Sequence, residues 1–533
     1  MTVLLRSSRN ISTKDTQYRW YSIADTKAEL NTKLTIPGLA ELLEDTFTNI
    51  GTLWWELGKV MGNSEGGNLA HAPTAASYNS DFGQMLAWVK LTEKLASHEE
   101  IFLAVCDDPW LFRELAGIPG VESGSPPYLW LRELYMFFRG YLARSRLAAK
   151  LALASVMFSK KLENKKFSDR VVFAYAHPSS GADGMDAYFG DLMKKIPHTI
   201  RLIHTDGKIS LARRLLSKRT ASLHGWGSLR HCLSLIFKKW RIKGLRREDS
   251  YHWLKRRSIS IENGGAAIAS NFWQIQCQER LLLSLKPKII LWPWENHPWE
   301  RELTRTAKTL GIKTIGYQHA VIGLQQFNPC PKSNVDGLNS IPETIICSGP
   351  AYYNQLVKWS VPEEKLVIGG AFRFKKSLSV SYDPSGPVFV AASADTDITK
   401  SLIQSISAAK GGGRKFIVKI HPLYPKNIIL SHGIEITDKT LPEQNTLSAV
   451  VYGTGASGLE GLLAGIPTFR LRPQNKVAIN VLPEGIDAVP FLPKDLKGLL
   501  DRARPKKVLK WNKIYSPVKM DVWKQQLSIN ELI

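Results

Sequence analysis

Two segments in the later part of the chain gather side chains that suit the binding of a phosphate group. In residues 415–425 (KFIVKIHPLYP), a β-branched apolar run that predicts a buried strand ends at Lys419 and His421, and Pro422 fixes the turn that follows. In residues 449–469 (AVVYGTGASGLEGLLAGIPTF), a second such run leads into small and hydroxyl-bearing residues at the start of an apolar helix: Gly453, Thr454, Gly455, Ser457 and Glu460. Unpaired N–H groups at a helix start attract anions, and a nearby lysine and histidine add positive charge. This combination suits a nucleotide phosphate better than a metal ion or a nucleophile.

Candidate acids and bases follow three predicted strands earlier in the chain, over residues 171–176, 289–292 and 314–317. Asp183 lies in the loop after the first of these strands, Glu295 follows the second and His319 follows the third. Because parallel sheets place their ligand sites outside the carboxyl ends of the strands, we expect these three side chains to face one crevice. The alternative for Asp183 and for its neighbour Asp186 is that each caps the helix that follows.

Three further residues are candidates for the same cleft: Asp186, Gln318 and Arg373. Arg373 lies in a predicted hinge, where it either binds an anionic group of a ligand or is a plain surface residue, and the second interpretation is the simpler one. Glu460, in the first turn of its helix, either contacts a ribose or caps the helix.

The elements that must position these residues alternate between strand and helix, which predicts an α/β fold with two Rossmann-like domains facing across a cleft. A chain of 533 residues is too long for one compact core. We expect a mostly helical N-terminal region and a terminal helix that folds back, with these boundaries: 1–165, N-terminal region; 166–377, acceptor-side domain with a basic insertion at 208–257; 378–510, nucleotide-binding domain; 511–533, terminal helix.

Composition places the protein among globular chains, with 44% hydrophobic and 22% charged residues. No window approaches the apolar length of a membrane span, and the first residues resemble no secretory signal. The five cysteines are scattered without a CxxC pair, which argues against a disulfide framework and against structural zinc. We therefore expect a location in the reducing cytoplasm.

The formal net charge of +24 calls for an anionic partner. Most of the excess lies in residues 208–257, where lysine and arginine alternate with Trp226, Trp240 and Trp253. Cations interspersed with tryptophan are typical of a segment on an anionic bilayer, so we expect this segment to dock on the inner face of the plasma membrane. A solvated helix face is the alternative. Nucleic acid is not an expected partner, because no helix-turn-helix, RNP, KH or zinc module is present.

The order and spacing of several motifs add a resemblance to a family. The His-Pro at 421–422 is followed by the Ser/Thr turn at 454–457, and W-x-W-E-N-x-x-W-E-R at 292–301 precedes G-x-Q-H, S-G-P and G-G-A-F-R-F. These motifs, over residues 171–500, resemble GT-B glycosyltransferases that use CMP-activated acidic sugars, namely bacterial sialyltransferases and transferases of Kdo and nonulosonic acids. In those families the His-Pro and the Ser/Thr helix start hold the cytidine nucleotide. The resemblance therefore assigns nucleotide binding to His421, Pro422, Thr454 and Ser457, although this chain has Thr-Gly-Ala-Ser where several relatives have paired serines.

The resemblance implies transfer of an acidic sugar, Kdo or nonulosonate, from CMP to a glycan or lipid-linked glycan acceptor of a surface polysaccharide such as lipopolysaccharide or capsule. Lys419, His421 and the helix start would neutralise the departing phosphate, so neither a metal ion nor a separate cofactor is expected. Glu295 is the first candidate for the base and Asp183 the second, with His319 beside them. A retaining and an inverting route both remain open. The alternatives are a CDP-glycerol-type phosphotransferase, a UDP-sugar 2-epimerase, and a basic adaptor without activity.

Overall fold

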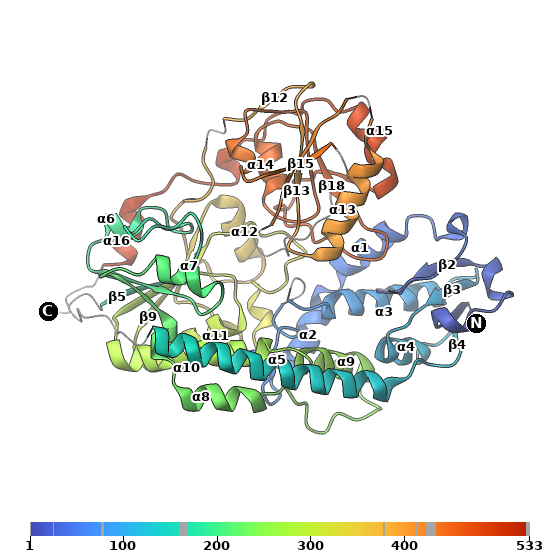
Figure 1. The fold of residues 1–533 in the computed structure, drawn as a ribbon, viewed down its shortest axis with the longest axis horizontal. Coiled ribbons are helices and arrows are strands. Elements are labelled where there is room, and N and C mark those ends of the chain that lie inside the picture. Colours follow the sequence, from blue (N-terminus) through green and yellow to red (C-terminus); the bar gives the residue numbers. More distant parts are fainter. Residues whose placement is uncertain are drawn as a thin grey trace.

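The computed structural model describes residues 2–24, 26–75, 79–158, 169–376, 379–411, 413–421 and 433–528. It is an α/β protein in which three larger parallel sheets and their helices lie beside one another, with a further two-stranded parallel sheet of β12 (Ser381–Tyr382) and β16 (Thr446–Leu447). Figure 1 shows the six-stranded sheet at the top, the seven-stranded sheet at the lower left and the N-terminal sheet at the right.

The seven-stranded sheet has the order β11-β10-β9-β8-β5-β6-β7 and all of its pairings are parallel. Counted along the chain, the first three strands run outward in one direction and the fourth returns to the other side of the first, as in a Rossmann fold. The strands are β5 (Arg170–Ala174), β6 (Thr199–Ile203), β7 (Thr220–Ser222), β8 (Ile289–Pro293), β9 (Lys313–Gln318), β10 (Thr344–Cys347) and β11 (Leu366–Ile368).

The six-stranded sheet repeats this plan with the order β15-β14-β13-β17-β18-β19, again all parallel. Its strand order of 3-2-1-4-5-6 is that of Rossmann dinucleotide-binding domains. The prediction of an α/β fold with two Rossmann-like domains is therefore confirmed. The strands are β13 (Val388–Ala391), β14 (Phe416–Lys419), β15 (Ile434–Thr437), β17 (Ala449–Tyr452), β18 (Thr468–Leu471) and β19 (Val489–Phe491), with helices α13 (Thr396–Ala408), α14 (Ser457–Leu463) and α15 (Leu496–Asp501).

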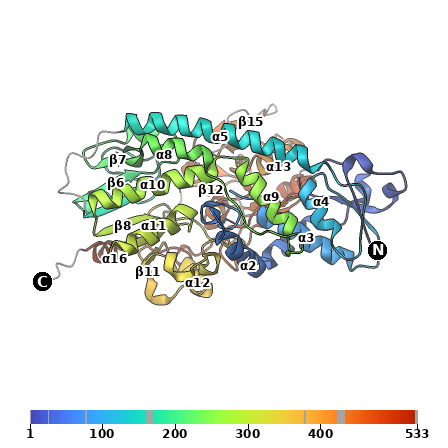
Figure 2. The same cartoon turned by 90° about the horizontal axis from the view of Figure 1, so that it is seen from below.

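The N-terminal region contains a sheet of its own as well as the expected helices. Its four parallel strands have the order β2-β3-β1-β4. They are β1 (Val3–Arg6), β2 (Arg19–Ser22), β3 (Phe102–Val105) and β4 (Val121–Ser123), and the helices are α1 (Leu39–Asn49), α2 (Gly51–Gly62), α3 (Phe82–Ala96), α4 (Pro109–Ala116) and α5 (Leu129–Met157). Seen from below, the long helix α5 runs along the outer edge of the molecule, and the shorter α8 lies next to it (Figure 2).

The remaining helices lie on or near the seven-stranded sheet, except that α9 packs against α3, α4 and α5 of the N-terminal region, and α8 against α5 and α10. They are α6 (Leu192–Lys195), α7 (Ile209–Arg214), α8 (Leu229–Ser234), α9 (His252–Asn263), α10 (Ala267–Leu285), α11 (Pro298–Thr309), α12 (Pro350–Lys358) and α16 (Met520–Gln526). The last of these returns to the sheet from the C-terminal end of the chain, where the buried Trp523 donates its indole N–H to the Gly369 carbonyl at 2.9 Å. No helix among the described residues is both long enough and apolar enough to cross a membrane.

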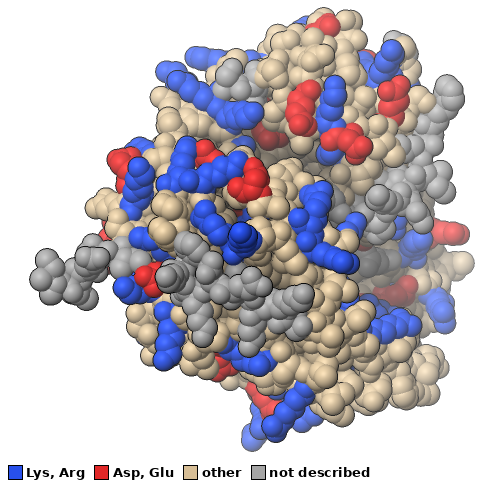
Figure 3. Space-filling view, turned by 60° about the vertical axis from the view of Figure 1, so that its left-hand side comes forward, with Lys and Arg blue, Asp and Glu red and all other residues tan. Residues whose placement is uncertain are grey.

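The basic segment 208–257 is built into the fold, because it supplies α7, the edge strand β7, α8 and the start of α9. Trp226 and Trp240 are buried, and their indole N–H groups donate to the hydroxyls of Ser284 and Ser64. The interpretation that these tryptophans lie at lipid headgroups is therefore wrong. Tryptophan alternates with lysine and arginine because one side of the segment packs into the core and the other side faces solvent. Lysine and arginine are nevertheless widespread on the surface, with fewer acids between them on the face shown in Figure 3.

A buried ion triad joins the N-terminal region to the six-stranded sheet. Glu44 on α1 accepts hydrogen bonds from Arg470 at 2.5 Å and from Arg472 at 2.6 Å, both on or next to β18. The side chains of Glu44 and Arg470 are 9% and 5% exposed. If one of these two groups were removed, water could not reach the other to take its place. The triad therefore holds the N-terminal region against the six-stranded domain.

We expect Glu44→Ala to destabilise the protein by about 3–5 kcal/mol, because two arginines, one of them buried, lose their carboxylate. A matched control is Glu41→Ala on the same helix, whose side chain is 64% exposed and lies 3.8 Å from Arg472. Thermal unfolding should show a large fall in the midpoint for Glu44→Ala and almost none for Glu41→Ala. Equal midpoints for the two variants would show that the triad does not carry this interface.

Candidate functional site

Each large sheet has one point where the strand order reverses, and some of the candidate residues follow the strands at these two points. In the seven-stranded sheet the reversal lies between β5 and β8, and in the six-stranded sheet it lies between β13 and β17. Ligands of such sheets bind in the crevice outside the carboxyl ends of the strands at the reversal. Glu295 follows β8, Ser393 follows β13 and the turn 453–457 follows β17.

Glu295 lies between two histidines. Its carboxylate accepts a hydrogen bond from His297 Nε2 at 2.8 Å, and His319 Nε2 lies 3.3 Å from its other oxygen. Burial raises the pKa of Glu295, but the hydrogen bonds and charges of the two histidines outweigh burial and hold the pKa well below its usual range. Burial lowers the pKa of His297, and the carboxylate of Glu295 more than compensates, so the pKa of His297 is raised. Glu295 and His319, which follow β8 and β9, therefore lie side by side, whereas Asp183, expected in the same crevice, does not join them.

His319 is held in one tautomer by its two neighbours. Arg373 donates to His319 Nδ1 at 3.2 Å, and because an arginine can only donate, Nδ1 is the acceptor. In the neutral ring the proton therefore lies on Nε2, which faces Glu295. Burial lowers the pKa of His319, and Glu295 only partly offsets this effect, so the neutral form is favoured. The ring also meets Tyr188 edge-on, with centroids 5.0 Å apart.

Arg373 follows β11, the last strand of the seven-stranded sheet along the chain. Its guanidinium lies over the ring of Tyr188 at 5.5 Å and is exposed to solvent. Burial raises the pKa of Glu460, on α14 of the six-stranded domain, to about 7, although the positive charge of Arg373 acts to lower it. Arg373 forms no ion pair with any carboxylate among the described residues. It is therefore a cation at the domain boundary with capacity to bind an anion, and not an isolated surface residue.

Glu300, which the sequence analysis did not single out, fixes the loop that carries Glu295. Its Oε2 accepts hydrogen bonds from the indole of Trp292 at 3.2 Å and from the backbone N–H groups of Glu295 and Asn296 at 3.0 and 2.8 Å. The side chain is 1% exposed, and burial raises the pKa of its carboxyl to about 7. An acidic residue in the first turn after a helix-starting proline was the available signal for such a role.

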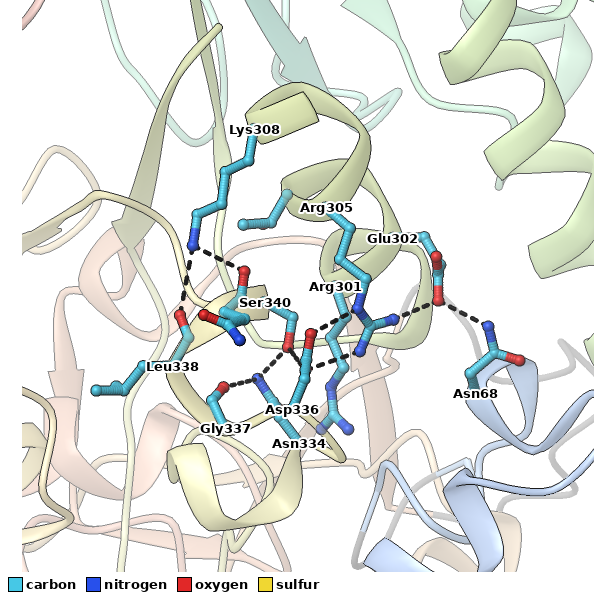
Figure 4. A network of polar contacts seen from close by, with 12 residues as sticks. Asn68, Arg301, Glu302, Arg305, Lys308, Asn334, Asp336, Gly337, Leu338 and Ser340 are labelled. Carbon is cyan, nitrogen blue, oxygen red and sulfur yellow. Dashed lines mark hydrogen bonds and ion pairs between the residues drawn. The ribbon is translucent and has the colours of Figure 1, made fainter. Parts of the chain in front are cut away.

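Further polar contacts hold α11, and with it the same loop, to residues 328–340. Asn296 adopts a left-handed conformation with φ of 61°, and its buried amide donates to the carbonyl of Asn328 and to Asn334. Figure 4 shows how Arg305 on α11 reaches Asp336, at 2.8 and 2.9 Å, while Asp336 also accepts from Ser340 at 2.6 Å. Glu295 is thus presented by a rigid loop.

Three predicted site residues have structural partners instead. Asp183 is exposed and forms an ion pair with Lys194 at 2.6 Å. Asp186 is buried, accepts from the N–H groups of residues 188 and 189, and pairs with the equally buried Arg201 at 3.3 Å. Gln318 is fully buried, and its side-chain oxygen accepts from the N–H and hydroxyl of Ser348. No contact among the described residues links these three side chains to Glu295.

The predicted nucleotide-binding residues follow neighbouring strands of one sheet, since β14 and β17 flank β13. The Thr454 hydroxyl is 3.1 Å from that of Ser393, across the reversal point. Lys419 donates to the carbonyl of Asp438, and His421 lies partly buried just beyond β14, where burial lowers its pKa. Pro422 lies outside the described residues.

The turn after β17 owes its glycines to two different causes. A Cβ on Gly453 would lie 2.3 Å from Ile398 on α13, so this glycine permits close packing. Gly455 has φ of 113° and open space around it, so it serves the backbone turn and leaves room beside Ser457, the first residue of α14. No group of three or more His, Cys, Asp or Glu side chains in the described part of the chain is placed to hold a metal ion.

No protein-family model and no curated protein matches this sequence. Among solved structures, the glycotransferase of kitacinnamycin has a TM-score of 0.39 at 11% identity and covers 68% of this chain and 99% of its own. The UDP-GlcNAc 2-epimerase from Methanocaldococcus jannaschii has a TM-score of 0.39 at 13% identity, and the match covers 67% of this chain and 99% of the epimerase. MurG from Acinetobacter baumannii has a TM-score of 0.32 at 11% identity, with 63% and 90% covered. The predicted GT-B plan of two Rossmann-like domains agrees with the strand orders described above, and the activity is argued below from this chain's own side chains.

The buried carboxyl of Glu300 predicts a pH-dependent stability. Its folded pKa of about 7 lies above the ordinary value of 4.5, so the folded protein keeps a proton that the unfolded chain releases. The contribution of Glu300 to stability is therefore present below pH 4.5 and is lost as the pH rises to 7, a difference of ~3 kcal/mol. We expect Glu300→Gln, which mimics the protonated acid, to raise the thermal midpoint at pH 8 and to leave it almost unchanged at pH 5.

Glu364→Gln, an exposed substitution, is the control and should leave both midpoints unchanged. Burial also raises the pKa of Glu262 and of Glu460 to about 7, so Glu300→Gln should reduce the pH slope without abolishing it. A Glu300→Gln midpoint that is raised equally at both pH values would contradict a buried, proton-binding Glu300.

Proposed function

We propose that this protein is a GT-B glycosyltransferase that transfers an acidic sugar from a CMP-activated donor to an acceptor hydroxyl. The observation that carries the proposal is Arg373, which donates to His319 at 3.2 Å, lies over the ring of Tyr188 and forms no ion pair among the described residues. An arginine with free donors at the boundary of two Rossmann-like domains suits the carboxylate of an acidic sugar or the donor phosphate, because its planar fork binds such groups through two hydrogen bonds.

The six-stranded domain supplies the nucleotide half of the site. Lys419, His421 and the turn 453–457 lie at the carboxyl ends of β14 and β17, the two strands that flank β13. This is the edge of the sheet where such folds bind their ligands, which supports a nucleotide site there. A departing phosphate carries developing negative charge, which positively charged and N–H groups at a fixed position stabilise. The choice of cytidine follows from the family resemblance of the His-Pro and Ser/Thr motifs, as does a glycan or lipid-linked glycan acceptor.

In the seven-stranded domain, His319 is better suited than Glu295 to take the acceptor's proton. The pKa of Glu295 is held well below its usual range, which makes this carboxylate a weak base. His319 is neutral, and its Nδ1 becomes available once Arg373 turns to the donor's anionic group. Glu295 then acts as a positioning residue, because it faces Nε2–H and stabilises the imidazolium that forms.

The reaction follows from these roles. The acceptor hydroxyl gives its proton to His319 Nδ1, and the acceptor oxygen forms a bond to the anomeric carbon while the bond from that carbon to the CMP oxygen breaks. CMP leaves with the bonding electrons, and Arg373 and the residues after β14 and β17 stabilise its charge. We write this as an inverting displacement, because both oxygens of Glu295 are engaged by histidines and no carboxylate at this position is free to act as a nucleophile.

The second candidate function is a UDP-sugar 2-epimerase, which the cluster of Glu295, His297 and His319 favours. Removal of a proton next to a carbon centre needs such a dense set of acids and bases in the cleft. A CDP-glycerol-type phosphotransferase would use the same cytidine site. The nucleotide that the protein binds and the donor that it uses therefore distinguish these candidate functions.

Nucleotide binding is the first test. We expect CMP to raise the thermal midpoint of the wild-type protein more than UDP does, and we expect His421→Ala to abolish the CMP shift, because a donor near the departing phosphate is lost. His98→Ala, an exposed histidine in the N-terminal region, is the control and should keep the shift. Selectivity for UDP would favour the epimerase and contradict the cytidylate donor.

Turnover separates the roles of His319 and Glu295. With CMP-N-acetylneuraminate, CMP-Kdo or CDP-glycerol as donor, we expect CMP release only from a CMP-sugar. His319→Gln should lower this rate on the order of 10²–10⁴-fold, as the loss of a general base does. Glu295→Gln should lower it less and displace its pH profile, because it acts through His319.

Both variants should keep the thermal shift with CMP, which shows that the nucleotide site is intact. Asp191→Asn is the control, since this aspartate is exposed and pairs only with Lys195 at 3.0 Å. A wild-type rate in His319→Gln would remove His319 from the mechanism. Conversion of UDP-N-acetylglucosamine with uptake of solvent deuterium would identify the epimerase.

A further inference from the structure

Helix α5 presents a large apolar surface to solvent. Trp130 is 63% exposed, Phe138 is 61% exposed and Tyr128, just before the helix, is 77% exposed. At about 100° per residue, Leu142 and six other exposed apolar side chains fall within roughly 140° of arc on this helix. The six others are Trp130, Leu131, Leu134, Tyr135, Phe138 and Tyr141. We name these six residues the α5 face. Large aromatic side chains gathered on one exposed surface mark a docking site.

The opposite side of α5 is firmly attached to the protein, so the α5 face is fixed in direction. A Cβ on Gly140 would lie 1.8 Å from the carbonyl oxygen of Asn263, so the two backbones touch. Arg144 is 2% exposed and donates to the carbonyls of Ile236 and Asn263 at 2.9 and 2.6 Å. Rotation of α5 to bury the α5 face would break these contacts.

Cations border the α5 face. Exposed side chains at Arg132, Arg139, Arg146 and Lys150 lie within about 40° of one another around the helix, next to the apolar arc. The helix has one carboxylate, Glu133, and it is paired with Arg256 at 2.7 Å. No unpaired acid on α5 therefore opposes an anionic partner.

A neighbouring element extends the same surface. Helix α8 and the following turn η7 (Leu235–Phe237) lie against α5, and Figures 1 and 2 both show α8 beside it. Leu233 and Phe237 on these elements are 67% and 73% exposed. Lys239 lies 4.5 Å from the ring of Phe137 on α5, so a cation and an aromatic ring join the two elements at the surface.

We propose that the α5 face, with α8 and η7, docks the protein on a bilayer that contains anionic phospholipid. Aromatic and leucine side chains enter the headgroup and acyl boundary while the bordering arginines contact the phosphates. A second copy of this chain would bring the same cations face to face, which a formal net charge of +24 opposes. Nucleic acid would use the cations but leave the leucines without partners. This proposal does not depend on the transferase activity. The membrane anchor is then the α5 face with α8 and η7, and not the buried tryptophans of segment 208–257.

Vesicle co-flotation of the full chain tests this proposal. We expect binding to vesicles of phosphatidylcholine and phosphatidylglycerol at low salt, release at high salt, and little binding to phosphatidylcholine alone. Trp130→Ser with Phe138→Ser should weaken partitioning on the order of tenfold for each ring removed. Arg132→Glu with Arg139→Glu should weaken it by a similar factor only on the anionic vesicles.

Matched controls carry the same changes elsewhere on the surface. Val60→Ser with Ile436→Ser removes apolar side chains that are 57% and 56% exposed, and Lys494→Glu with Lys497→Glu reverses two exposed charges on the six-stranded domain. Both controls should bind as the wild-type protein does, and all variants should keep its thermal midpoint.

Three results would overturn the proposal. The first is wild-type binding by the α5 variants, and the second is equal binding to neutral and anionic vesicles. The third is a wild-type dimer, seen by sedimentation velocity without vesicles, that Trp130→Ser with Phe138→Ser converts to monomer, because the α5 face would then be covered by a second copy of the chain.

Discussion

The buried carboxyl of Glu300 is the interaction on which the candidate site depends. One of its oxygens accepts three N–H groups, two of them from the backbone of the loop that carries Glu295. This loop also contains Asn296 in a left-handed conformation, which few residues other than glycine adopt without support. The free energy that burial of Glu300 costs at neutral pH is offset by the order it imposes, because Glu295 reaches both histidines only from this loop position.

Much of the fold could be predicted because its central strands are short runs of β-branched and apolar residues bounded by turns, as in β5, β8, β13 and β17. The N-terminal sheet could not. Its strands have three or four residues each, and β2 pairs with β3 across three helices, so no local pattern indicates the partner. Only the packing of those helices against the strands decides the pairing, and a single sequence does not contain that information in readable form.

Part of the site could also be predicted, for a topological reason. Glu295 and His319 follow adjacent parallel strands, so their meeting follows from the strand order. The strand order does not show which of the loop aspartates belong to the site. Asp186 is a cleft candidate in the sequence, and only the buried Arg201 on β6 shows that its charge is already neutralised. Arg373 is the opposite case. It follows β11 at the end of one domain, and its contacts with His319 and Tyr188 make this exposed arginine a ligand-binding candidate.

The formal positive charge of the sequence likewise does not show which of its cations can reach a partner. Several arginines serve the interior: Arg144 and Arg301 donate to backbone carbonyls, and Arg257 is buried between Asp81 and Asp108. Such cations add to the formal charge of +24 but cannot reach a partner. A partner responds to exposed charge and to the apolar surface beside it. These coincide on α5, where Arg132, Arg139 and Arg146 form no ion pair with any described residue and the rings beside them are exposed. The basic segment of the sequence and the docking surface of the molecule therefore overlap only in part. Trp226 and Trp240 of the segment are buried, whereas its Leu233 and Phe237, on α8 and η7, are exposed. The exposed rings of Trp130 and Phe138 come from α5, outside the segment.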